Sequence, residues 1–90
     1  MSVRINIPHE WRHHTKNHAT VEVRGDTVGQ CLNDLVRQFP QIGQGLFDKD
    51  NKLQNYVQVY VNRESSYQEE MAEPVKDGDE IDMVIMIGGG

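Results

Sequence analysis

One segment of the chain has the periodicity of an amphipathic helix, and this limits what the remaining segments can fold into. From residue 28 to residue 39, the apolar side chains recur at helical spacing and gather on one arc. Asp26 or Thr27 can cap the first turn, and Pro40 ends the helix. The strands on either side must therefore bury their apolar faces against this single helix. The apolar arc consists of Val28, Leu32, Leu35, Val36 and Phe39.

Three other segments alternate apolar and polar residues, as half-buried strands do. Residues 2–7 and 19–24 are adjacent in the sequence and predict an antiparallel pair, whereas residues 56–62 are rich in valine and tyrosine. The inward side chains are expected to be Val3, Ile5, Ile7, Ala19, Val21, Val23, Val57, Val59 and Val61.

The last strand, residues 80–87, follows a predicted turn at Asp77-Gly78 and ends in an unbroken apolar run. Such a run is expected of a strand with neighbours on both sides, so we place it at the centre of the sheet. If Ile81, Met83, Ile85 and Ile87 face the helix, then Asp82, Val84 and Met86 face the other way. Together these patterns predict an α+β fold with two layers.

The connections are less regular. Residues 40–55 are expected to form an irregular loop with at most one helical turn, anchored by Ile42, Leu46, Phe47 and Leu53. A polar stretch from residue 62 to residue 73 has room for a short edge strand near Tyr67.

Composition excludes several classes of function. Ninety residues suit one domain, and a net charge of -5 argues against nucleic-acid binding and favours basic protein partners. One cysteine cannot form an intrachain disulfide, and we see no export signal. The longest apolar run, residues 83–87, is far too short to cross a membrane. A cytoplasmic location is expected.

The three terminal glycines are the strongest functional signal. A linker remnant is the main alternative, but here glycine follows the strand directly. Three residues span at most about 10 Å, and glycine has no Cβ to block a narrow passage, so the tail can enter a buried site on a partner. Its one reactive group is the terminal carboxylate, which needs activation by another protein, most plausibly as an acyl-adenylate made from ATP.

Other candidate chemistry is better explained as scaffold. Cys31 lies at the edge of the apolar arc and is expected to be a buried small hydrophobe rather than a nucleophile. His9, His13, His14 and His18 include two pairs at i, i+4 spacing, yet a solvated connection is favoured over a metal site. The segments "IGQGLF" and "DKDNK" fail as a nucleotide cradle and a calcium loop.

The order "VEVRGDTVGQCLNDL", "VYVNRE", "VKDGDEIDMV" and a glycine end resembles the MoaD/ThiS family of ubiquitin-like sulfur carriers, in particular its longer CysO-like members. The resemblance implies a β-grasp fold, with a mixed four- to five-stranded sheet on one main helix. It divides the chain into a domain, residues 1–87, and a flexible tail, residues 88–90.

The resemblance also implies a role for the tail. A ubiquitin-activating-type enzyme would use ATP to adenylate Gly90, and a sulfur donor protein would convert the adenylate to a thiocarboxylate for a downstream biosynthetic enzyme. Gly88, Gly89 and Gly90 would enter the partner's active site. Gly88 is an additional glycine where many relatives carry another residue.

Docking is expected on the face opposite the helix, where Val84 and Met86 lie beside Tyr56 or Tyr60.

The chain is expected to be a carrier rather than an enzyme, with no bound cofactor, no metal, no nucleic-acid or membrane partner, and a monomeric free form. Two alternatives remain open: a ubiquitin-like modifier conjugated to lysines, and a small subunit of a molybdopterin-synthase-like complex. The acceptor could be a molybdopterin, thiamine or cysteine precursor.

Overall fold

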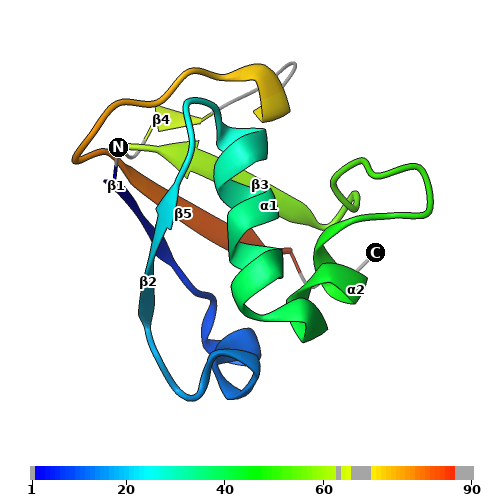
Figure 1. Ribbon diagram of the computed structural model, residues 1–90. Helices are drawn as coiled ribbons and strands as arrows, with labels where there is room; N and C mark the ends of the chain where they lie inside the picture. The colour runs from blue at the N-terminus through cyan, green and yellow to red at the C-terminus, as the bar shows by residue number, and fades with distance from the viewer. Residues whose placement is uncertain (1, 63, 66–69, 87–90) are drawn as a thin grey trace.

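A single long helix, α1 (Val28–Gln38), lies across one face of a mixed β-sheet, as the sequence predicts (Figure 1). The structure is a computed structural model, and it describes residues 2–62, 64–65 and 70–86. Within them, five strands form one sheet in the order β2-β1-β5-β3-β4. The strands are β1 (Ser2–Asn6), β2 (Thr20–Arg24), β3 (Val57–Val61), β4 (Glu64–Ser65) and β5 (Glu80–Ile85).

The position of β5 confirms the interpretation of its apolar run. β5 lies between β1, to which it is parallel, and β3, to which it is antiparallel. β1 and β2 form the expected antiparallel pair. The short edge strand expected in the polar stretch is β4, at the edge of the sheet, and Tyr67 itself lies outside the described residues. β1 and β5 therefore end at the same edge of the sheet, where the chain continues toward its terminal glycines.

The core fills the space between α1 and the sheet. Its residues are Val3, Ile5, Ile7, Val21, Val23, Val28, Cys31, Leu32, Leu35, Ile42, Leu46, Val57, Val59, Val75, Ile81 and Met83. Ala19, which we expected to face inward, is exposed because β2 begins only at Thr20. Val61 and Ile85, at the ends of their strands, are only half-buried.

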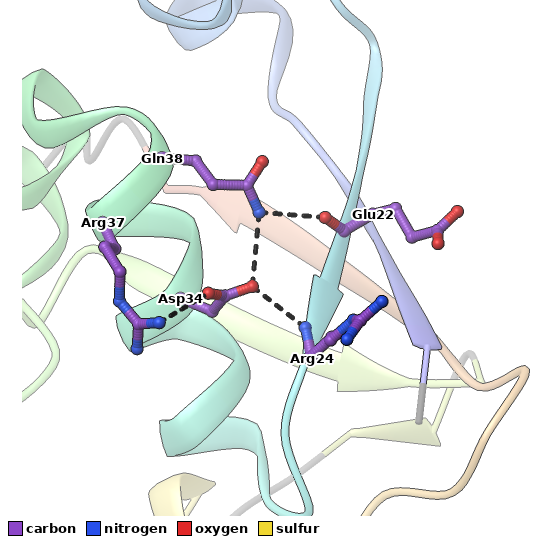
Figure 2. A network of polar contacts seen from close by, with 5 residues as sticks. All are labelled: Glu22, Arg24, Asp34, Arg37 and Gln38. Carbon is purple, nitrogen blue, oxygen red and sulfur yellow. Dashed lines mark hydrogen bonds and ion pairs between the residues drawn. The ribbon is translucent and has the colours of Figure 1, made fainter.

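Hydrogen bonds fix the position of α1. The Thr27 side chain caps the helix by accepting a hydrogen bond from the Gln30 amide at 3.2 Å. Along the helix, Asp34 Oδ2 accepts from the Arg24 amide at 3.0 Å, and Gln38 Nε2 donates to the Glu22 carbonyl at 3.0 Å (Figure 2). These two contacts attach α1 to the outer edge of β2.

The connections contain more structure than their sequences indicate. The polar segment after β1 forms the 3₁₀ helix η1 (His9–Thr15), and the segment after α1 forms η2 (Pro40–Ile42) and the short helix α2 (Gly43–Leu46). The expected loop is present, but it contains two short helical segments where one turn was expected. No helix in the described part of the chain is long and apolar enough to cross a membrane.

The 3₁₀ helix η3 (Glu70–Ala72) packs on the first turn of α1. Gly29 makes this contact possible, because a Cβ at that position would lie 2.8 Å from the Met71 carbonyl oxygen. Sequence reasoning did not find this contact, since nothing in the polar stretch before Pro74 indicates which turn of the helix it covers.

Candidate functional site

The sheet face opposite α1 carries an apolar patch next to the start of the tail. Among the described residues, the large hydrophobic side chains that remain exposed are Tyr56, Val84 and Met86, with exposed fractions of 38%, 44% and 47%. Val84 pairs with Gln58 across the strands, and the Met86 amide donates to the Tyr56 carbonyl at 2.7 Å. These three side chains, the open-face patch, therefore lie together at the start of β3 and the end of β5.

Tyr56 is held in place by a contact outside the sheet. Its hydroxyl donates to the Gly45 carbonyl of α2 at 2.8 Å. Gly45 also packs against Trp11 of η1, since a Cβ there would approach the Trp11 ring to 3.1 Å. As a result, η1, α2 and the start of β3 support the edge of the sheet where the tail begins. The sequence assigned Trp11 and Gly45 to separate connections and did not predict their contact.

Tyr60, the fourth residue predicted to bind a partner, is half-buried. Its hydroxyl donates to Gln58 Oε1 at 2.9 Å, and it pairs with Asp82 across the strands. Tyr60 therefore lies at the border of the open-face patch, where it contributes part of its ring and a polar group that is already hydrogen-bonded.

A row of polar side chains crosses the same face beside the patch. Thr20 Oγ1 donates to Asn6 Oδ1 at 2.9 Å, and Asn6 Nδ2 donates to Asp82 Oδ1. The three residues lie on β2, β1 and β5, so the row depends on the register of three strands. It gives the apolar patch a hydrogen-bonding border, which is the usual arrangement of a protein interface.

Ile87, Gly88, Gly89 and Gly90 lie outside the described residues. The last backbone contact before them is the hydrogen bond from the Met86 amide. The proposed roles of the three glycines remain predictions.

Cys31 is unsuited to nucleophilic chemistry in the folded chain. The residue is completely buried, and burial raises the pKa of its thiol from 9.0 to about 11, with Asp34 and Asp26 adding to the increase. A thiol with this pKa is protonated at neutral pH and is a poor nucleophile. The expected burial of this side chain in the core is confirmed.

The histidines do not line up as their i, i+4 spacing would require for a metal site. η1 is a 3₁₀ helix with three residues per turn, so positions four apart do not share a face. His13 and His14 instead place their ring centroids 3.9 Å apart. In the described part of the chain, no three histidine, cysteine or acidic side chains are grouped to hold a metal ion.

The segment that begins like a calcium loop is closed by its own carboxylate. Asp48 Oδ1 accepts from the amides of Asp50 and Lys52 at 2.8 and 3.0 Å. The Lys52 amide is the main reason that the pKa of Asp48 lies below its usual value. This carboxylate closes a turn, as expected for a loop.

Known proteins similar to this chain share its length and fold. The sulfur carrier protein CysO of Mycobacterium tuberculosis is 32% identical over 93 aligned residues that cover all of both chains. A chain of the Amycolatopsis orientalis BexX/CysO complex is 31% identical, with a TM-score of 0.86 and coverage of 98% of this chain and 99% of that one. SAMP1 from Haloferax volcanii is 26% identical, with a TM-score of 0.86 over the full length of both.

These similarities identify the architecture as the β-grasp, ubiquitin-like fold. The ThiS family matches residues 5–90, which is nearly the whole chain. This chain therefore belongs to the ThiS family.

Proposed function

We propose that the chain is a sulfur carrier protein that acts as a co-substrate for other enzymes. Relatives at 32% identity over the full chain are sulfur carriers, and this is the observation that carries the proposal. The structure supports it with the open-face patch, which lies directly before the terminal glycines. The similarity to CysO favours an acceptor in cysteine biosynthesis over molybdopterin or thiamine.

The proposed chemistry takes place at the Gly90 carboxylate. An ionised carboxylate is a poor electrophile, so it must first attack the α-phosphate of ATP on the partner enzyme, releasing pyrophosphate. A sulfide equivalent from a sulfur donor protein then attacks the acyl carbon, AMP leaves, and a thiocarboxylate remains. The β-grasp body presents the tail and docks through Tyr56, Val84 and Met86, with Tyr60 at the border of this surface.

The partner is proposed to be an adenylating enzyme of the ubiquitin-activating type. The Amycolatopsis orientalis CysO was crystallised in a complex with BexX, which supports association with a partner protein but does not specify adenylation. The same kind of association fits an exposed apolar patch bordered by hydrogen-bonding groups.

Intact-mass measurement tests the proposal. After incubation with ATP, a sulfide source and the cognate adenylating enzyme, the chain should gain the mass of one sulfur and lose that of one oxygen. A control chain that ends at Gly89 should keep its mass, because the register of the tail in the partner site is then wrong. A full-length chain that never gains this mass would contradict the carrier function.

A ubiquitin-like modifier is the second candidate, favoured by the similarity to SAMP1, a small archaeal modifier protein. Conjugation would leave Gly90 in isopeptide bonds to target lysines, which tryptic peptide mapping of cell lysate detects. The third candidate, a synthase small subunit, predicts co-purification with a large subunit in a fixed ratio.

A further inference from the structure

A hollow of about 270 Å³ between η1 and the C-terminal end of α1 plays no part in the proposed sulfur chemistry. His13, His14 and Lys16 line one side, and Phe39 and Gln41 lie on the other. No aspartate or glutamate is among the residues that line it. A site with three basic side chains and no carboxylate is unexpected in a chain with a net charge of -5.

The His13 and His14 rings lie against each other at the first hollow. Their centroids lie 3.9 Å apart, and His14 Nδ1 lies 3.1 Å from Gln41 Oε1. When Nδ1 donates to that oxygen, Nε2 is the ring nitrogen left for a second partner.

A second hollow of about 260 Å³ adjoins the first and shares Gln38 and Phe39 with it. It runs along the start of β2 and is lined by His18, Thr20 and Glu22. Gln38 of α1 donates to the Glu22 carbonyl (Figure 2). Both residues line the second hollow. The first hollow therefore carries the basic side chains, whereas the second carries a carboxylate.

We propose that this histidine groove, formed by His13, His14, Lys16 and Phe39, binds an acidic peptide segment of a partner protein. A carboxylate of the segment occupies the first hollow, whose lining contains no carboxylate. Charge complementarity argues for this occupant, since acidic side chains match the basic lining.

Among the residues that line the two hollows, Glu22 is the one carboxylate, and it lines the second. His18 and Glu22 face the second hollow from the β2 side. On α1, Asp34 and Arg37 pair with each other at 3.4 Å and line neither hollow. The binding of an acidic segment does not depend on a thiocarboxylate, so this proposal stands or fails separately from the carrier function.

The test is an amide NMR titration of the ¹⁵N-labelled chain with a short poly-glutamate peptide at low salt. Shifts are expected at residues 13–18 and 38–41, and binding should weaken with added salt. The double variant His13→Gln/His14→Gln should lose about tenfold or more in affinity, as expected when a hydrogen bond to a charged group is removed.

His9→Gln is the matched control, because His9 belongs to the same 3₁₀ helix but lines neither hollow. It should bind like the unchanged chain. Lys16→Asn is a second test that preserves the fold, since Lys16 has a φ of 54° and asparagine tolerates this conformation. The proposal is wrong if the peptide causes no localised shifts, if the double variant binds equally well, or if inorganic phosphate reproduces the shifts and the peptide is not preferred.

Discussion

Cys31 is a potential nucleophile by residue type and a core residue by position. Its phase on α1 predicts that it faces the sheet, and the structure buries it completely. The effect of that burial on its pKa could not be derived from the sequence, because the increase depends on every group packed around the sulfur. Asp34 is three residues away on the helix, whereas the strands that exclude water come from distant segments.

The pKa of Cys31 predicts that stability falls at alkaline pH. The thiol titrates near 9.0 in the unfolded chain and at about 11 in the folded chain, so the unfolded state loses its proton first as the pH rises. The stabilisation is therefore complete below pH 9 and is lost between these two values. At about pH 10.5 the loss should be about 2 kcal/mol.

Urea unfolding at about pH 8 and about pH 10.5 measures this loss, and Cys31→Ala is the control. Lysine and tyrosine side chains also titrate in this range, and the variant retains their contribution. The difference between the two proteins should grow smaller at the higher pH. An equal pH dependence in both would show that Cys31 does not contribute.

At the level of secondary structure, the attachment of α1 to β2 illustrates how an edge strand is protected. Asp34 accepts hydrogen bonds from the Arg24 amide and from Gln38 Nε2, the latter at 3.3 Å (Figure 2). Gln38 Nε2 also donates to the Glu22 carbonyl. Helix side chains thus occupy backbone groups of β2 that could otherwise pair with another strand. The helical pattern placed these two residues on the polar side of α1 and did not show that they contact the sheet.

Asp34→Ala should therefore lower the free energy of unfolding by about 1 kcal/mol. The variant loses the hydrogen bonds of Asp34, and the higher helix propensity of alanine offsets part of that loss. Chemical denaturation measures the change. Arg37→Ala is the matched control: it removes the ion pair to Asp34, but the Arg37 side chain is 78% exposed, so a change within about 0.5 kcal/mol is expected. Similar losses in the two variants would mean that the backbone contacts contribute little.

At the scale of the whole molecule, the structural support and the exposed apolar surface meet at one end of the sheet. β5 ends there beside the open-face patch, and contacts among Trp11, Gly45 and Tyr56 join two connections around it. The connections therefore support the end of the sheet at which the described part of β5 stops.

Met86→Glu tests whether this end is the docking surface. Met86 is 47% exposed, so the substitution should change the free energy of unfolding by no more than about 0.5 kcal/mol. Affinity for the adenylating enzyme, measured by calorimetry, should fall about tenfold, because a charge is buried in an apolar contact. Asn33→Glu adds the same charge on the exposed side of α1 and should leave affinity unchanged. Equal affinity of all three proteins would exclude the patch.

The sequence by itself determined the helix, the faces of the strands and the central place of β5, and it narrowed the helix cap to Asp26 or Thr27, because these depend on local periodicity and on turn and capping residues. It also placed Val84 and Met86 on the face away from the helix, since side chains alternate along a strand. Only the tertiary structure decided which separate segments meet. Strand register and packing set the distances between residues from separate segments, and no single segment encodes them. Examples are the Tyr56–Gly45 hydrogen bond, the Thr20–Asn6–Asp82 row and the histidine groove.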